Sequence, residues 1–223
     1  MAGFLGKNFI FRIHMMGHRL LSRVQNSEDR LYDLIGQRLL PEANKTEIDQ
    51  RIWDLFGEEW CVMMTDLAGF SRRVAEYGII HFLQTIYESE RLLLPMIEQH
   101  EGFLLKTDGD SFLVIFRKPQ KALQCAIVMQ QTLIPYNQAK LEQEKVHLCV
   151  GLGFGKILRV GNTEVFGAEV NAACKLGEDV AKQGETLVTG AFKQACAGFA
   201  GVAYQTLEHA PAGANSAYKV ILT

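Results

Sequence analysis

The sequence lacks several features that would each assign it to a function class. Its 23 Lys and Arg against 25 Asp and Glu give a net charge of −2, which excludes the basic surplus typical of a nucleic-acid-binding domain. No run reaches the ~18 apolar residues of a membrane-spanning helix. The six histidines show no metal-ligand spacing such as HExxH, which excludes that zinc-protease motif. We therefore expect no nucleic acid among the partners.

Cysteine and proline are also scarce. The five cysteines lie mostly in apolar runs and form no CxxC pair. An odd number of cysteines, with no secretory signal, predicts reduced thiols and a cytoplasmic protein. The chain has 223 residues, of which 48% are apolar, and only five prolines. This length and composition predict one full domain plus an appendage.

The first quarter of the chain differs in pattern from the rest. We interpret residues 1–57 as an N-terminal helical extension and residues 58–223 as the main domain. Residues 4–16 form an apolar stretch that charged side chains interrupt, and it lacks the cleavage site of a signal peptide. Two alternatives stay open for the extension. It is either an arm that packs on a partner subunit or a peripheral membrane segment with weak membrane contact through residues 1–20.

Short apolar runs alternate with helical patterns along the chain. Helices are predicted over residues 27–40, 46–56, 79–99, 167–181 and 191–197, with two more that start at Ser71 and Pro119. Strands are predicted over residues 60–65, 103–106, 111–116, 146–154, 157–160, 186–189, 203–207 and 217–222, with a turn at Gly155-Lys156. Because hairpins join several strands, the pattern predicts an α+β fold with a largely antiparallel sheet.

Two of the predicted strands carry an aspartate at one end. Asp66 follows the run over residues 60–65, and Asp110 follows the Asp108-Gly109 turn of a predicted hairpin. If these strands are neighbours, the two carboxylates converge and suit Mg²⁺ that substrate phosphates also hold. Amides at the start of the helix after Gly69 are a second place for a phosphate. The structural alternative stays open, since each Asp could instead satisfy local turn or helix amides.

Four motifs in order give the chain a family resemblance. They are TDLAGFS at 65–71, KTDGDSFLVIF at 106–116, GLGFGKILRVG at 151–161 and FGAEVNAACKL at 166–176. With these motifs the sequence resembles the class III nucleotidyl cyclases, the catalytic domains of adenylyl and guanylyl cyclases. The resemblance implies a ferredoxin-like βααββαβ core and a head-to-tail homodimer whose active sites lie at the interface.

The resemblance also implies roles at the metal and phosphate end of the site. Asp66, the carbonyl of Leu67 and Asp110 would hold two ions, Mg²⁺ or Mn²⁺. The substrate phosphates would lie against Gly69, Phe70 and Ser71.

The partner subunit would supply the groups that bind the nucleoside. Lys106 matches the lysine that recognises adenine, and Glu164 precedes Asn171 by seven residues, where adenylyl cyclases usually carry Asp or Thr. A lysine donor and a carboxylate acceptor suit adenine. In a two-residue hairpin loop, Thr107 would oppose Asp110, and Lys106 would point to the other face of the sheet. Lys106 and Asp110 would then serve different sites of the dimer.

Two catalytic positions show one match and one departure. Asn171 matches the asparagine that orients the ribose, whereas Lys175 stands where the family has a transition-state arginine. Lysine neutralises charge but lacks the bidentate fork of arginine. The loop at 208–218 also lacks the phosphate-binding lysine of the family.

The expected function is a cytoplasmic signal-transduction enzyme, either free or peripheral to a membrane. It would convert a nucleoside triphosphate, with ATP preferred, to a 3′,5′-cyclic nucleotide and pyrophosphate. Two alternatives follow from the departures. One is a degenerate cyclase domain that binds nucleotide as a sensor or scaffold, and the other is a cyclase for another base.

Overall fold

The computed structural model describes residues 27–223, except for the side chains of Phe70, Ser71 and Arg72. The predicted membrane contact through residues 1–20 lies outside the described residues. The chain divides into two compact units, and residues 27–57 and 159–164 belong to the smaller one. None of the helices in the described part of the chain is long and apolar enough to cross a bilayer.

The smaller unit contains two of the predicted helices, α2 (Ser27–Arg38) and α3 (Lys45–Phe56). Asn44 caps α3 by accepting a hydrogen bond from the backbone N–H of Glu47. Arg38 at the end of α2 forms a two-pronged ion pair with Asp49 of α3. The two helices are therefore joined by a specific contact as well as by their short connection.

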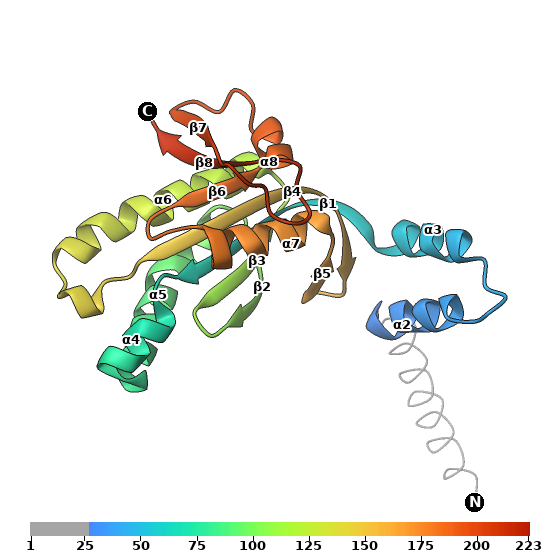
Figure 1. Ribbon diagram of the computed structural model, residues 1–223, viewed down its shortest axis with the longest axis horizontal. Helices are drawn as coiled ribbons and strands as arrows, with labels where there is room; N and C mark the ends of the chain where they lie inside the picture. The colour runs from blue at the N-terminus through green and yellow to red at the C-terminus, as the bar shows by residue number, and fades with distance from the viewer. Residues whose placement is uncertain (1–26) are drawn as a thin grey trace, which may run out of the picture. The chain divides into compact units, whose positions relative to one another are not determined.

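The larger unit is built on one mixed sheet (Figure 1). The strands are β1 (Gly57–Leu67), β2 (Phe103–Asp108), β3 (Ser111–Phe116), β4 (Leu148–Val160), β5 (Glu164–Phe166), β6 (Thr186–Thr189), β7 (Val202–Thr206) and β8 (Ala217–Leu222). Their order in the sheet is β2-β3-β1-β4-β6-β8-β7, with β5 paired to β4. The β4–β6 pair is parallel, and the β1–β3, β2–β3, β6–β8 and β7–β8 pairs are antiparallel.

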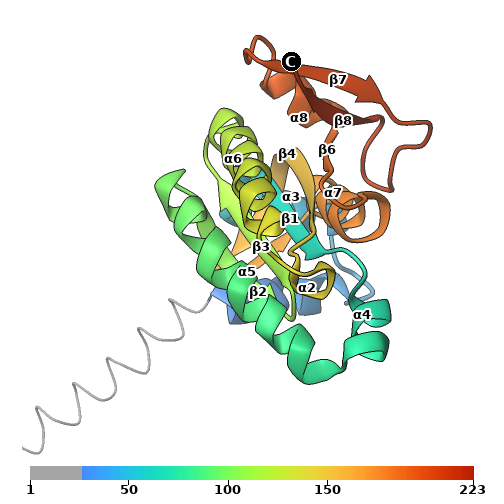
Figure 2. The same ribbon diagram turned by 90° about the vertical axis from the view of Figure 1, so that its left-hand side faces the viewer.

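Helices cover both faces of this sheet (Figure 2). They are α4 (Phe70–Tyr77), α5 (Ile79–Gln99), α6 (Pro119–Gln138), α7 (Ala168–Cys174) and α8 (Gly190–Ala195). The order β1-α4-α5-β2-β3-α6-β4 confirms the predicted βααββαβ core and the α+β class.

Strand β1 explains why both faces are apolar. Successive side chains of a strand point to opposite faces, and in β1 Cys61 and Met63 join one cluster with α5 and α6, while Val62 and Met64 join another with α7. Both sets are almost fully buried. Asp66 continues the Val62–Met64 series, so β1 presents it at its end on the α7 face.

The predicted turn at Gly155-Lys156 is wrong, because β4 continues unbroken from Leu148 to Val160. The glycines there serve a close approach and not a turn. A Cβ at Gly153 would lie 2.5 Å from the carbonyl oxygen of Glu169, and one at Gly155 would lie 3.1 Å from the Glu169 side chain. The chain turns instead at Gly161, whose φ of 63° suits a residue without a side chain.

The predicted register of the β2–β3 hairpin is also wrong. Asp108 pairs with Ser111 and Thr107 pairs with Phe112, so the loop is Gly109-Asp110 and no strand residue opposes Asp110. Gly109 adopts a φ of 58° at the first loop position, which moves the turn by one residue. The opposite-face argument for Lys106 and Asp110 therefore loses its basis.

The predicted helix over residues 167–181 changes character halfway. Regular α7 ends at Cys174, and Lys175–Val180 continues as a π-helical segment. Wider π turns of this kind are frequent at functional sites. Gly151 and Gly177 let this region lie directly on the sheet, since a Cβ at Gly177 would come within 2.7 Å of the carbonyl oxygen of Met64.

Candidate active site

The sheet brings the two predicted metal-binding aspartates together. In the β1–β3 register Thr65 lies opposite Phe112, so Asp66 comes next to Ser111, the residue after Asp110. The Ser111 hydroxyl donates a hydrogen bond to Asp66 Oδ1 at 3.2 Å. Burial raises the pKa of both Asp66 and Asp110, and the backbone N–H of Leu67 opposes that rise in both, so both carboxyl groups lie near that amide.

Burial disfavours the ionised form of both carboxyl groups. It raises the pKa of Asp66 to about 6, and the charge of Asp110 adds to this rise. Burial likewise raises the pKa of Asp110, against the effect of the backbone amides of Asp110 itself and Leu67. Asp110 Oδ2 is buried and has no hydrogen-bond partner among the described residues.

This arrangement fits a bound cation. A buried carboxylate oxygen without a partner is costly unless a cation or donor completes it. Among residues 27–223, no three His, Cys, Asp or Glu side chains come together as a metal site. The protein ligands would thus be two carboxylates and a carbonyl, which suits Mg²⁺ or Mn²⁺ that substrate phosphates also hold.

Glu178 adds negative charge near this end of the site, and sequence reasoning missed it. Partial burial raises the pKa of Glu178, and the charges of Asp179, Asp108 and Asp110 raise it further. Glu178 also contributes to the raised pKa of Asp66. No motif indicated Glu178, which directly follows Gly177 in the π-helical segment.

The loop after Asp66 is held by backbone bonds. The N–H of Ala68 donates to the carbonyl of His147 at 2.8 Å, and Gly69 is the N-cap of α4 with a φ of 84°. The N-cap residue of α4 is a glycine, so it has no side chain to cap the helix. The predicted phosphate-binding residues Gly69, Phe70 and Ser71 do begin this helix.

A buried arginine supports the same loop, and sequence reasoning missed it too. Arg73 of α4 donates from Nη2 to the carbonyls of Gln143 (2.6 Å) and Glu142 (3.3 Å). It lines a hollow of about 120 Å³ together with Ala68, Gly69 and His147. Its guanidinium therefore fixes the start of α4 to the segment before β4.

Asn171 and Lys175 lie on a different element, the α7 region. The Asn171 side chain donates from Nδ2 to the carbonyl of Ala212 at 2.8 Å. Lys175 Nζ forms an ion pair with Asp179 Oδ2 at 2.6 Å, one turn further along the π-helical segment. Both predicted catalytic side chains are exposed.

The two predicted base-binding residues fall in different compact units. Lys106 is an exposed residue of β2 that pairs with Leu113. Burial raises the pKa of the Cys174 thiol to about 11 against the charge of Lys106, which places Lys106 near α7. Glu164 begins β5 and belongs to the smaller unit with residues 159–163.

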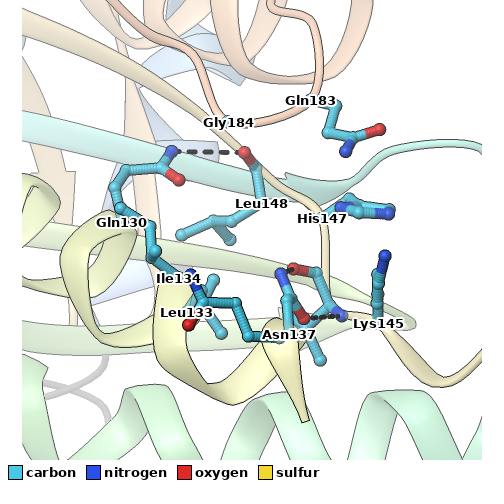
Figure 3. A pocket seen from close by; sticks show the side chains of 11 residues that line it. Gln130, Leu133, Ile134, Asn137, Lys145, His147, Leu148, Gln183 and Gly184 are labelled. Carbon is cyan, nitrogen blue, oxygen red and sulfur yellow. Dashed lines mark hydrogen bonds between the residues drawn. The ribbon is translucent and has the colours of Figure 1, made fainter. Parts of the chain in front are cut away.

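A separate cavity of about 310 Å³ lies between α6 and the start of β4 (Figure 3). Two of its polar side chains, Asn137 and Gln130, form hydrogen bonds to the backbone. Asn137 exchanges two hydrogen bonds of 2.8 Å with the backbone of Val146, and Gln130 donates to the carbonyl of Leu148. None of the predicted site residues lines this cavity.

Comparison with known proteins agrees with the fold. Residues 57–209 match the family model of the adenylate and guanylate cyclase catalytic domain. Because this match covers more than half of the chain, the protein belongs to that family.

Curated relatives resemble only part of this chain. The serine/threonine-protein kinase pkn2 of Myxococcus xanthus is 31% identical over 130 residues, which is 58% of this chain and 15% of that protein. Putative adenylate cyclase 3 of Rhizobium meliloti (strain 1021) is 28% identical over 115 residues, which is 52% of this chain and 19% of that protein. The chain thus spans less than a fifth of the length of these two relatives.

Among solved structures, the adenylate/guanylate cyclase/hydrolase from Silicibacter pomeroyi has the same fold. The TM-score is 0.64 at 24% identity, and the match covers 75% of this chain and 99% of that one.

Proposed function

We propose that this domain is a homodimeric nucleotidyl cyclase that depends on Mg²⁺ or Mn²⁺ and acts on a nucleoside triphosphate, with ATP preferred. The observation that carries the proposal is the pair of half-buried carboxylates, Asp66 and Asp110, with one buried oxygen that has no hydrogen-bond partner within residues 27–223. Family membership supplies the class of reaction.

The proposed reaction closes a ring within the substrate. The ribose 3′-oxygen forms a bond to the α-phosphorus, and the bond from that phosphorus to the bridging oxygen of the β-phosphate breaks. Pyrophosphate leaves, and the hydroxyl proton passes to solvent. Ions held by Asp66, Asp110 and the carbonyl of Leu67 would supply positive charge beside the phosphates.

Residues of this chain would hold the substrate around that centre. Backbone amides at Gly69, Phe70 and Ser71 would bind phosphate oxygens at the start of α4. From the partner copy, Asn171 would orient the ribose and Lys175 would neutralise charge on the phosphates. Lys106 and Glu164 would recognise adenine through a donor and an acceptor.

One observation favours a second candidate, a degenerate domain that binds nucleotide without turnover. Lys175 pairs with Asp179 on its own segment, and the loop at 208–218 carries no Lys or Arg. The next lysine, Lys219, is paired with Glu185 at 2.8 Å. Both family positions for positive charge on the phosphates are therefore weakened.

A substrate panel separates these candidates. The purified chain is incubated with each of the four nucleoside triphosphates and Mn²⁺, and a chelator serves as the matched control. Metal-dependent cyclic product from ATP supports the proposal, and a preference for another base supports a cyclase of different specificity. Nucleotide binding with no cyclic product from any triphosphate would establish the degenerate domain.

A mixing experiment tests the shared site. Asp110→Asn alone is expected to be inactive, and Asn171→Ala alone to retain only a small, measurable turnover, because they damage opposite halves of every site. Mixed in equal amounts, they should recover about a quarter of wild-type activity, since half of the dimers carry one intact site. No recovery after subunit exchange would place all groups within one chain.

A further inference from the structure

The loop between β7 and β8 is held against the first turn of α7 (Figure 2). The N–H of Leu207 donates to the carbonyl of Ala217 at 2.9 Å, and the N–H of Ala214 donates to the carbonyl of Pro211 at 3.1 Å. A Cβ at Gly213 would overlap the carbonyl oxygen of Ala168, so the loop backbone touches the helix there. The loop between β7 and β8 therefore packs directly on the first turn of α7.

The Asn171 side chain is part of the same contact. Its Nδ2 donates to the carbonyl of Ala212, 41 residues away in sequence. A side-chain amide has two N–H donors on one end and an acceptor oxygen on the other. When one N–H is bound to a fixed carbonyl, the direction of Oδ1 and of the second N–H is fixed as well.

We propose that the Ala212 carbonyl is the positioning group for Asn171, which sets the amide in the orientation that the ribose requires. This role rests on the proposed cyclase function. A positioning role also agrees with the composition of the loop, since residues 208–218 contain no Lys or Arg to bind phosphate. The loop acts through backbone shape and not through charge.

The helix is held independently on its other side. Glu169 Oε2 accepts hydrogen bonds from the backbone N–H of Phe154 (3.0 Å) and from the hydroxyl of Thr189 (2.7 Å). These bonds tie α7 to β4 and to the end of β6. Displacing the loop should therefore leave the helix in place and change only the orientation of the Asn171 amide.

The test disturbs the loop without touching Asn171. In Gly213→Ala the new methyl group meets the Ala168 carbonyl, and the φ of 102° is strained for alanine. Gly201→Ala is the matched control, because Gly201 has a similarly positive φ of 79° but open space around its Cβ position. Circular dichroism and the melting temperature establish that each variant is folded.

The kinetic readout is a double-mutant cycle of Gly213→Ala and Asn171→Ala. Gly213→Ala should lower kcat roughly 10- to 100-fold through misorientation, with KM for the nucleotide changed less than about threefold. Gly201→Ala should keep wild-type kcat. In the Asn171→Ala background, Gly213→Ala should have no further effect, since the group that it positions is gone.

Several outcomes would overturn this assignment. If Gly213→Ala and Asn171→Ala lower kcat by factors that multiply in the double variant, the loop acts on a group other than Asn171. If kcat is unchanged in Gly213→Ala, the loop does not set the orientation of the Asn171 amide. If Gly213→Ala does not fold, Ala214→Pro replaces it in the cycle, since it removes the N–H that bonds to Pro211. A wild-type chain without turnover would remove the proposed function itself, which is a distinct result.

Discussion

The two halves of the candidate site are built by different means. Asp66 and Asp110 are placed by neighbouring strands of one sheet, so backbone register alone brings them together. Asn171 and Lys175 are placed by a short helix, a π-helical segment and a distant loop. The carboxylate half thus depends on the register of paired strands, whereas the α7 half depends on side-chain and loop contacts.

The electrostatics of the two halves differ in the same way. The carboxylates are half-buried and near each other, so their negative charges repel each other. Asn171 and Lys175 are exposed and already satisfied by contacts within their own chain. We expect changes in the first half to abolish chemistry, and changes in the second half to tune it.

The largest effect is expected from Asp110→Asn. Loss of one charged ligand should lower turnover by roughly 10³-fold or more, while the melting temperature without divalent ions stays the same or rises, because the repulsion of Asp66 is removed. Turnover with Mn²⁺ and thermal unfolding measure the two quantities. Asp108→Asn, an exposed neighbour on the same hairpin, should keep turnover within about twofold. Equal losses in both variants would refute the metal assignment.

The contact of α7 with the sheet should be the next most sensitive feature. Gly151→Ala introduces a methyl group that overlaps the Ala173 carbonyl and the Gly177 amide. We expect a loss of about 1–3 kcal/mol in the free energy of unfolding and a loss of turnover, with metal binding by Asp66 and Asp110 retained. Urea unfolding and Mn²⁺ titration measure these.

The control for this substitution is Gly36→Ala in α2, where no other part of the described chain, beyond the adjacent residues and the helix backbone, lies within 4 Å of the new methyl group. It should stabilise the chain by about 0.5–1 kcal/mol, since alanine favours helix. If Gly151→Ala also abolished metal binding, the two halves would not be independent.

The carboxylate half should also give the folded protein a dependence on pH. The pKa of Asp66 is raised to about 6 in the folded state, above about 3.9 for an unfolded aspartate. The folded state therefore binds this proton more tightly, so stability is highest below pH 4 for this group and falls as the pH rises toward 6. Because the group is half exposed, we expect a fall of only about 1–2 kcal/mol.

Urea unfolding at several pH values, without divalent ions, measures this dependence. Asp66→Asn should reduce it by about this amount, and Asp33→Asn on α2 should not. Mn²⁺ should stabilise the wild-type chain more at pH 7 than at pH 5, because it competes with the proton. A flat profile for the wild-type chain would show that Asp66 is better solvated than its position indicates.

The sequence predicted the carboxylate half because its signals are local. An apolar strand that ends in Asp66, and a turn that carries Asp110, each fix a position within a few residues. Two glycine signals were misinterpreted for a physical reason. Gly155 permits the close approach of Glu169, which no turn rule distinguishes from a chain reversal, and Gly109 moved the hairpin loop by one residue.

The contacts that hold the α7 half in place could not be predicted from the sequence. Asn171 was found by motif, but its partner is a backbone carbonyl 41 residues away, and a carbonyl carries no sequence signal. The buried Arg73 was missed for the same reason, since its acceptors are the backbone carbonyls of Glu142 and Gln143. The π-helical segment that begins at Lys175 contains Gly177, which lies directly on the sheet, and no sequence rule signals such a contact.

The smallest effects are expected at the ion pair of Lys175 and Asp179. Both side chains are more than half exposed, and exposed pairs contribute little to stability. Asp179→Asn should leave the melting temperature unchanged within error and alter kcat by no more than about threefold. Lys175→Met should lower kcat clearly, because it removes the positive charge itself and not only its partner.

Lys175→Arg tests whether a positive charge at this position still contributes to kcat. Arginine offers a planar fork to phosphate oxygens that lysine cannot offer, so kcat should be kept or raised, and Asp179→Asn should add to any gain by freeing the fork. The measurement is kcat for the four variants with the preferred triphosphate and Mn²⁺. If Lys175→Met matched the wild type while Lys175→Arg gave no gain, the positive charge at this position would play no part in turnover. The α7 half would then act through Asn171 and its loop alone.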